Sequence, residues 1–154
     1  MKSKLFSLLF ITIFCSFTLD NVYVWEKYRI QITVPDDFKV TKNTDEDFDM
    51  EGDGMELSIG IFEGDISLDD LEEATVAGAK SMKMTEIDAS HPTKINQLEG
   101  FYVEGFLEGD RVMFAGLLDP RTKTNMFVAI TFADDDENAE EEAFKILNSL
   151  KRLK

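Results

Sequence analysis

The chain has 154 residues with 16 basic and 31 acidic side chains, and its formal net charge at pH 7 is −15. This length suits one domain whose core is large enough to fold without disulfides, and a hydrophobic content of 44% excludes a disordered chain. The acidic balance excludes a nucleic-acid partner and an anionic-lipid surface, because clustered Lys and Arg side chains bind both of these.

The first 18 residues have the pattern of a secretory signal peptide. Lys2 and Lys4 precede residues 5–14, a run without any charged side chain. This run is too short to span a bilayer, which needs about 20 apolar residues, but it suits the apolar region of a signal sequence. We therefore expect the chain to be exported.

The cleavage site decides what the exported protein carries. Small side chains precede a cut after Thr18, which predicts that residues 19–154 form a single periplasmic or secreted domain. Such a domain would lack cysteine and carry a net charge of −17, as suits a bacterial envelope protein that folds without disulfides. Lipidation at Cys15 is the alternative, although Phe14 stands where a small residue is expected.

Alternating apolar and polar side chains predict the first strands of the domain. Residues 28–34 alternate over the length of a half-buried strand, and Pro35 ends it because proline cannot donate to a ladder. Phe38 and Val40 predict the start of a second short strand. The polar residues 41–47 predict a loop after it.

A hairpin and a helix follow. Residues 48–50 and 57–61 flank a Gly-Asp-Gly turn, where glycine permits the positive φ that a tight hairpin requires. Ser67 then precedes apolar or small side chains that recur every three or four residues, which predicts an amphipathic helix over residues 68–82 with Ser67 as its N-cap. Residues 85–92 are interpreted as a connector.

Four apolar runs in the second half predict a meander of antiparallel strands, because short turn sequences separate them. The expected strands cover residues 94–98, 101–107, 111–118 and 125–132. A last helix is expected between four acidic residues at 134–137 and the basic residues 151–154, since this order of charges complements a helix dipole. The sequence thus predicts an α+β fold: an antiparallel sheet of about five to seven strands with two main helices packed on it.

Three segments resemble the PsbP-like superfold, which includes the photosystem II protein PsbP, the bacterial envelope lipoprotein DcrB and a Ran-binding nuclear import factor. They are residues 28–38 (YRIQITVPDDF), residues 98–100 (LEG) and residues 144–150 (FKILNSL). The resemblance implies an α/β/α sandwich and a binding or accessory role without catalysis. It identifies no site residues, because members of this group have unrelated functions.

Seven acidic side chains lie between positions 45 and 56, and clustered carboxylates are the ligands that calcium prefers. The candidate metal ligands are Asp47, Asp49, Glu51 and Asp53. Their spacing begins like an EF-hand loop, but Ser58 stands where that loop needs a bidentate glutamate. The alternative is a hairpin whose alternate acids point to one solvated face.

The remaining candidates are a histidine and three aromatic residues. His91 is the only histidine, and we interpret it as an exposed loop residue. Tyr23, Trp25 and Tyr28 either bind a partner or cover one end of the core.

The sequence contains no nucleophile elbow, phosphate loop, dinucleotide fingerprint or zinc-protease motif, and no cofactor is expected. We interpret the chain as an exported, non-enzymatic binding or accessory protein of the bacterial envelope, whose partner is another envelope protein. That partner would be contacted through the exposed face of the sheet or the aromatic N-terminal segment. Two alternatives stay open: a calcium-binding protein that uses residues 45–56, and a carboxylate-based hydrolase, which requires two acids in one pocket.

Overall fold

The computed structural model describes residues 20–62 and 64–154, so the expected signal peptide and Cys15 lie outside the described residues. The elements, in chain order, are β1 (Asp20–Trp25), β2 (Ile30–Pro35), β3 (Lys39–Asn43), β4 (Asp47–Gly52), β5 (Met55–Phe62), α1 (Leu68–Ser81), β6 (His91–Ile95), β7 (Leu98–Leu107), β8 (Asp110–Asp119), β9 (Thr124–Phe132), α2 (Ala139–Ser149) and β10 (Lys151–Arg152). Within these described residues, neither helix is long and apolar enough to cross a membrane.

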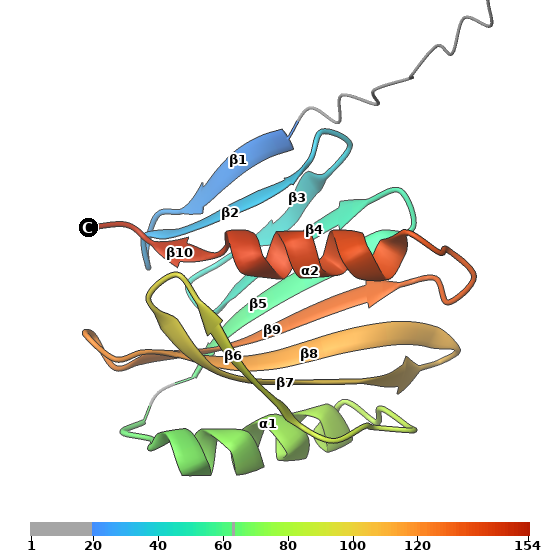
Figure 1. Ribbon diagram of the computed structural model, residues 1–154. Coiled ribbons are helices and arrows are strands. Elements are labelled where there is room, and N and C mark those ends of the chain that lie inside the picture. The colour runs from blue at the N-terminus through green and yellow to red at the C-terminus, as the bar shows by residue number, and fades with distance from the viewer. Residues whose placement is uncertain (1–19, 63) are drawn as a thin grey trace, which may run out of the picture.

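The elements form three layers (Figure 1). The central layer is a seven-stranded antiparallel sheet in the order β3-β4-β5-β9-β8-β7-β6. One face of this sheet packs against α1, mainly through β7 and β8. The other face is covered by α2 and by a small sheet in the order β1-β2-β10. This arrangement confirms the predicted α+β class and its sandwich of layers.

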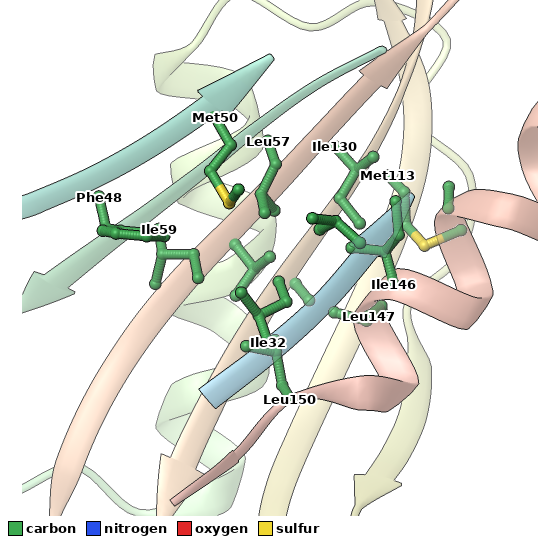
Figure 2. Close-up of a cluster of buried hydrophobic side chains, with 14 of the residues drawn as sticks. Ile32, Phe48, Met50, Leu57, Ile59, Met113, Ile130, Ile146, Leu147 and Leu150 are labelled. Carbon is green, nitrogen blue, oxygen red and sulfur yellow. The ribbon is translucent and has the colours of Figure 1, made fainter. Parts of the chain in front are cut away.

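The main core lies between the large sheet and the layer that contains α2 (Figure 2). Met50 and Leu57 point from β4 and β5 toward Ile32 of β2, and Ile146 and Leu147 approach from α2. All five side chains are buried. Burying a large aliphatic side chain stabilises the folded state by about 1.5–3 kcal/mol, so this layer holds the fold together.

Close packing fixes α1 on the opposite face. The Ser67 hydroxyl accepts a hydrogen bond from the Asp70 amide at 3.1 Å, which confirms the predicted N-cap. About two turns after Ser67, Thr75 is buried against β8. A Cβ atom at Gly116 would lie 2.1 Å from the Thr75 hydroxyl oxygen. Glycine is therefore required at Gly116 for this close approach of helix and strand.

The structure corrects three strand predictions. Residues 41–43 belong to β3 and are not a loop; this edge strand is exposed along its whole length, so it lacks an apolar alternation. The run 94–98 is not one strand, because Asn96 adopts φ 53° in the turn between β6 and β7. The strand β1 was not predicted, because its valines and aromatic residues form one continuous run without alternation.

The end of the last helix is also corrected. The helix begins at Ala139, after the acidic run, and ends at Ser149. Lys151 and Arg152 are not in its last turn; they form β10 and pair with Gln31 and Ile30 of β2. Arg152 is largely buried and lies 3.8 Å from a carboxylate oxygen of Asp119, so its charge serves an ion pair and not the helix dipole.

Candidate functional site

An acidic surface lies on the open part of the sheet, on the same side as α1. The core-facing side chains of β4 and β5 include Phe48, Met50, Leu57 and Ile59, so the residues between them point to the opposite face. We call this surface the acidic sheet face; it consists of Asp47, Asp49, Glu51, Glu56 and Ser58.

Part of the acidic sheet face borders a shallow hollow of about 330 Å³. Asp49, Glu51 and Glu56 stand on its strand side. Apolar lining comes from three elements that are distant in sequence: Met82 at the end of α1, Leu107 of β7 and Ala129 of β9. The hollow therefore combines apolar contact area with carboxylates at its border.

The carboxylates of this face differ in their partners. Asp47 accepts a hydrogen bond from the Lys42 ammonium at 2.6 Å, and this bond raises the pKa of Lys42 above its ordinary value. Asp49 accepts one from the Ser58 hydroxyl at 2.6 Å. Glu51 and Glu56 lie directly opposite each other in the β4–β5 register. Within the described residues, no Lys, Arg or His nitrogen lies within 4.0 Å of the carboxylates of Asp49, Glu51 or Glu56.

The metal-ligand candidates lie along one hairpin. Asp47, Asp49 and Glu51 follow one another at alternate positions of β4, so successive side chains are separated by about 6–7 Å of strand. Asp53 lies beyond the strand, where its amide donates to the Asp37 carboxylate at 2.5 Å. In residues 20–62 and 64–154, no group of three or more His, Cys, Asp or Glu side chains could hold a metal ion. Calcium binding here stays a prediction.

Replacing Glu56 with lysine is expected to raise the free energy of unfolding by about 0.5–1 kcal/mol, because Glu56→Lys turns a directly opposed like-charge pair into an attractive one. Urea denaturation of the variant measures this gain. Glu108→Lys, in the exposed turn between β7 and β8, makes the same change in net charge away from Glu51. An equal gain in both variants would attribute the effect to net charge and not to the opposed pair.

The three aromatic candidates fix the small sheet to the large one. Trp25 is buried, and its indole N–H donates to the Thr44 carbonyl at 3.0 Å. The Tyr28 hydroxyl donates to the Asp45 carbonyl at 2.7 Å, and the Tyr23 hydroxyl donates to the backbone before β3. These contacts explain the aromatic residues as cover for one end of the core. Partner binding through the partly exposed Tyr23 and Tyr28 stays a prediction.

His91 does not lie in a loop, as the sequence suggested, but begins β6. Its Nε2 atom lies 2.9 Å from a carboxylate oxygen of Asp88, and its ring stacks on that of Tyr102. The other Asp88 oxygen accepts from the Glu104 amide at 2.7 Å. Asp88 is three positions before His91, and its bond to the Glu104 amide of β7 holds its carboxylate beside the ring.

A second depression of about 580 Å³ lies between α2 and β2. Burial raises the pKa of Glu142 on its helical side, and the nearby charges of Asp37 and Asp136 act in the same direction. The neighbouring Glu141 is paired with Lys145 at 2.8 Å, and this hydrogen bond lowers the pKa of Glu141. The hydrolase alternative requires two carboxyl groups that face each other across a bound substrate, and it stays a prediction.

No protein-family model matches the chain, and no curated protein sequence matches it. Solved structures do share its fold. Cyanobacterial PsbP (CyanoP) from Synechocystis sp. PCC 6803 has a TM-score of 0.62 and 10% identity, over 90% of this chain and 95% of that one. The Saccharomyces cerevisiae Ran-binding protein Mog1p has a TM-score of 0.56 and 12% identity, over 87% of this chain and 95% of that one.

A protein from Bacteroides thetaiotaomicron VPI-5482 is also similar, with a TM-score of 0.54 and 13% identity over 88% of this chain. The chain spans about half of that protein, 48% of its length. At these identities the likeness concerns the fold alone, and it agrees with the resemblance found in the sequence. The chain has the fold that PsbP and Mog1 share.

Proposed function

We propose that this protein is a non-enzymatic binding module of the bacterial envelope, and that its acidic sheet face binds a basic segment of another protein. The observation that carries the proposal is a group of carboxylates without an ion-pair partner beside an open hollow. Asp49, Glu51 and Glu56 border that hollow, and no basic nitrogen of the described residues lies within 4.0 Å of their carboxylates. Lys39 and Lys42 of β3 lie opposite Glu51 and Asp49 in the strand register, but Lys42 forms its ion pair with Asp47.

The hollow suits the shape and chemistry of a lysine or arginine side chain. The long aliphatic part of such a side chain can lie against Met82 and Ala129, while its charged end reaches Glu51 or Glu56. Association also relieves the repulsion between the opposed Glu51 and Glu56, which the free protein retains. A bound cation thus gains more than the exposed charges alone would provide.

The structural neighbours support the same class of function by analogy. Mog1p is described as a Ran-binding protein, so this fold is known to present a protein-binding surface. The analogy supports binding as the general activity and does not identify the partner, because function resides in sites that differ between members of one fold. The proposed location in the envelope rests on the charge pattern of residues 1–18.

A titration with a basic probe tests the proposal. The probe is a peptide of about ten residues that alternates lysine and serine, and binding is measured by calorimetry at low and at physiological ionic strength. The double variant Asp49→Asn/Glu51→Gln is expected to bind about tenfold more weakly than the natural protein, because each exposed ion pair contributes about 0.2–1 kcal/mol.

The matched control is Asp69→Asn/Glu73→Gln, which removes two charges from exposed positions of α1. We expect this variant to retain the affinity of the natural protein. Equal weakening in both double variants would show that net charge alone attracts the probe and would contradict a specific site. Intact mass of the exported protein tests its location: a chain that starts at Leu19 supports export, and one that retains Met1 in the cytoplasm contradicts it.

A further inference from the structure

The strand β1 presents an unpaired edge. Among residues 20–62 and 64–154 it pairs only with β2, and Figure 1 shows no strand or helix of these residues beyond its other side. The direction of its backbone groups follows from the pairing of β2. The Thr33 N–H donates to the Ser149 hydroxyl at 2.9 Å, and Gln31 pairs with Lys151 of β10, so both residues direct their backbone groups away from β1.

In an antiparallel pair, residues opposite each other either both bond to the partner strand or both point away from it. Val22 lies opposite Thr33, and Val24 lies opposite Gln31. The N–H and C=O groups of Val22 and Val24 therefore point to the free edge. The bonds that hold β1 to β2 come from the residues between them.

The other sheet edges carry features that prevent strand addition. The edge strand β3 contains Lys39 and Lys42, with a register shift between Val40 and Lys42. At the opposite edge, β6 contains Pro92 and Lys94. The strand β10 covers only one end of the second edge of β2. Along the rest of that edge, Pro35 has no N–H, and the Ser149 hydroxyl accepts from the Thr33 N–H and donates to the Thr33 carbonyl. The strand β1 has no lysine, no proline and no register shift.

We propose that the free edge of β1 accepts an extended segment of a partner protein as an additional antiparallel strand. Unpaired main-chain donors and acceptors on an edge are satisfied by another extended backbone. The Val22 side chain, 58% exposed, is the most exposed large apolar side chain of the described residues and lies on the outer face of the same strand. An apolar side chain at the matching position of the added strand would cover it.

Charge selects the occupant. Asp20 lies at one end of β1 and Glu26 directly follows the other, while the chain carries a net charge of −15. A second copy is disfavoured, because self-pairing centred on Tyr23 would place Asp20 opposite Glu26 at both ends. The favoured occupant is a segment with alternating β-branched residues and basic residues at its ends.

The test uses the peptide Lys-Thr-Val-Thr-Val-Thr-Lys and the full domain. Amide hydrogen exchange is expected to slow at Val22 and Val24 when the peptide binds, because only the outward-pointing amides gain a partner. Val22→Pro removes one outward N–H without breaking a bond to β2 and is expected to weaken binding about fivefold. Val22→Thr keeps the N–H and loses only part of the apolar contact, so it is expected to bind more tightly than Val22→Pro, and unchanged melting midpoints confirm that both variants fold.

The following results would contradict strand addition at the β1 edge. Unchanged exchange at Val22 and Val24, or equal affinities of Val22→Pro and Val22→Thr, would place the peptide elsewhere. Exchange that slows with protein concentration in the absence of peptide would identify a second copy as the occupant. The variant Asp49→Asn/Glu51→Gln distinguishes the two surfaces: it is expected to leave the exchange effect intact, so failure of the acidic sheet face and failure of the β1 edge are separate results.

Discussion

Replacing Trp25 with alanine is expected to lower the free energy of unfolding by about 3–5 kcal/mol. The indole is only 2% exposed and stacks on Phe48 at a centroid distance of 5.8 Å. The Tyr28 ring contacts the indole edge-on at a centroid distance of 4.7 Å, and the indole N–H donates a hydrogen bond to the Thr44 carbonyl. Alanine removes this packing and leaves a cavity where the small sheet meets the large one.

Urea denaturation followed by circular dichroism measures the loss. Because natural domains are stable by only about 5–15 kcal/mol, Trp25→Phe provides a second variant that keeps most of the buried apolar volume. This variant loses the hydrogen bond to the Thr44 carbonyl, and its free energy of unfolding is expected to be lower by about 1 kcal/mol. A loss below that value for Trp25→Ala would contradict the assignment of Trp25 to the core and would favour the interpretation of the aromatic segment as a partner surface.

Replacing Asp119 with alanine is expected to lower the free energy of unfolding by about 3–5 kcal/mol, because breaking a buried ion pair leaves a charge without compensation. Asp119 is fully buried, and it accepts hydrogen bonds from the Arg121 amide at 3.0 Å and the Arg121 Nε at 3.3 Å. Arg152, whose side chain is 12% exposed, lies 3.8 Å away. Within the described residues its Nε and Nη1 atoms have no hydrogen-bond partner, so its charge depends on Asp119.

The Asp119 carboxylate also predicts that the stability of the fold depends on pH. Burial alone would raise the pKa of Asp119, but the hydrogen bonds from Arg121 outweigh it and hold the pKa below its ordinary value. The folded state therefore binds this proton less readily than the unfolded state. Its contribution to stability is complete above the ordinary aspartate pKa of about 3.9 and is lost as the pH falls through the depressed folded value.

Denaturation midpoints measured from neutral to strongly acidic pH test this account. We expect Asp119→Asn, which keeps the size of the side chain, to be less stable at neutral pH and to lose less stability on acidification. Asp135→Asn, at an exposed position before α2, is the matched control and is expected to follow the natural protein. If the stability of Asp119→Asn fell with acidification as steeply as that of the natural protein, the proposed role of the Asp119 carboxylate would be contradicted.

The regular elements could be predicted because their side-chain period follows burial. Ser67 and the residues after it gave α1 and its cap, and the Gly-Asp-Gly turn gave the β4–β5 hairpin. The sequence missed β10, because two basic residues after a helix have no apolar period. Their position is decided by a buried carboxylate on β8, more than 30 residues earlier in the chain. Local pattern does not report contacts of that kind.

The sequence predicted the acidic residues of the candidate site but not the hollow beside them. Alternate acids in residues 45–56 indicated one solvated face, and the structure places Asp49 and Glu51 on it. The hollow beside them could not be found from the sequence, since Met82 and Leu107 reach it only through the packing of α1 and the order of the strands. The β1 edge was missed because the strand itself was not predicted.

The most direct test of the central claim is to map the lysine–serine peptide on the natural protein by amide chemical shifts. If the acidic sheet face is the binding surface, the largest shifts occur in β4, in β5 and at Met82, where the hollow lies. They decrease as salt screens the charges. Shifts spread over all acidic regions, including the α1 surface at Asp69 and Glu73, would contradict the claim and leave an acidic domain without a specific site for a basic partner.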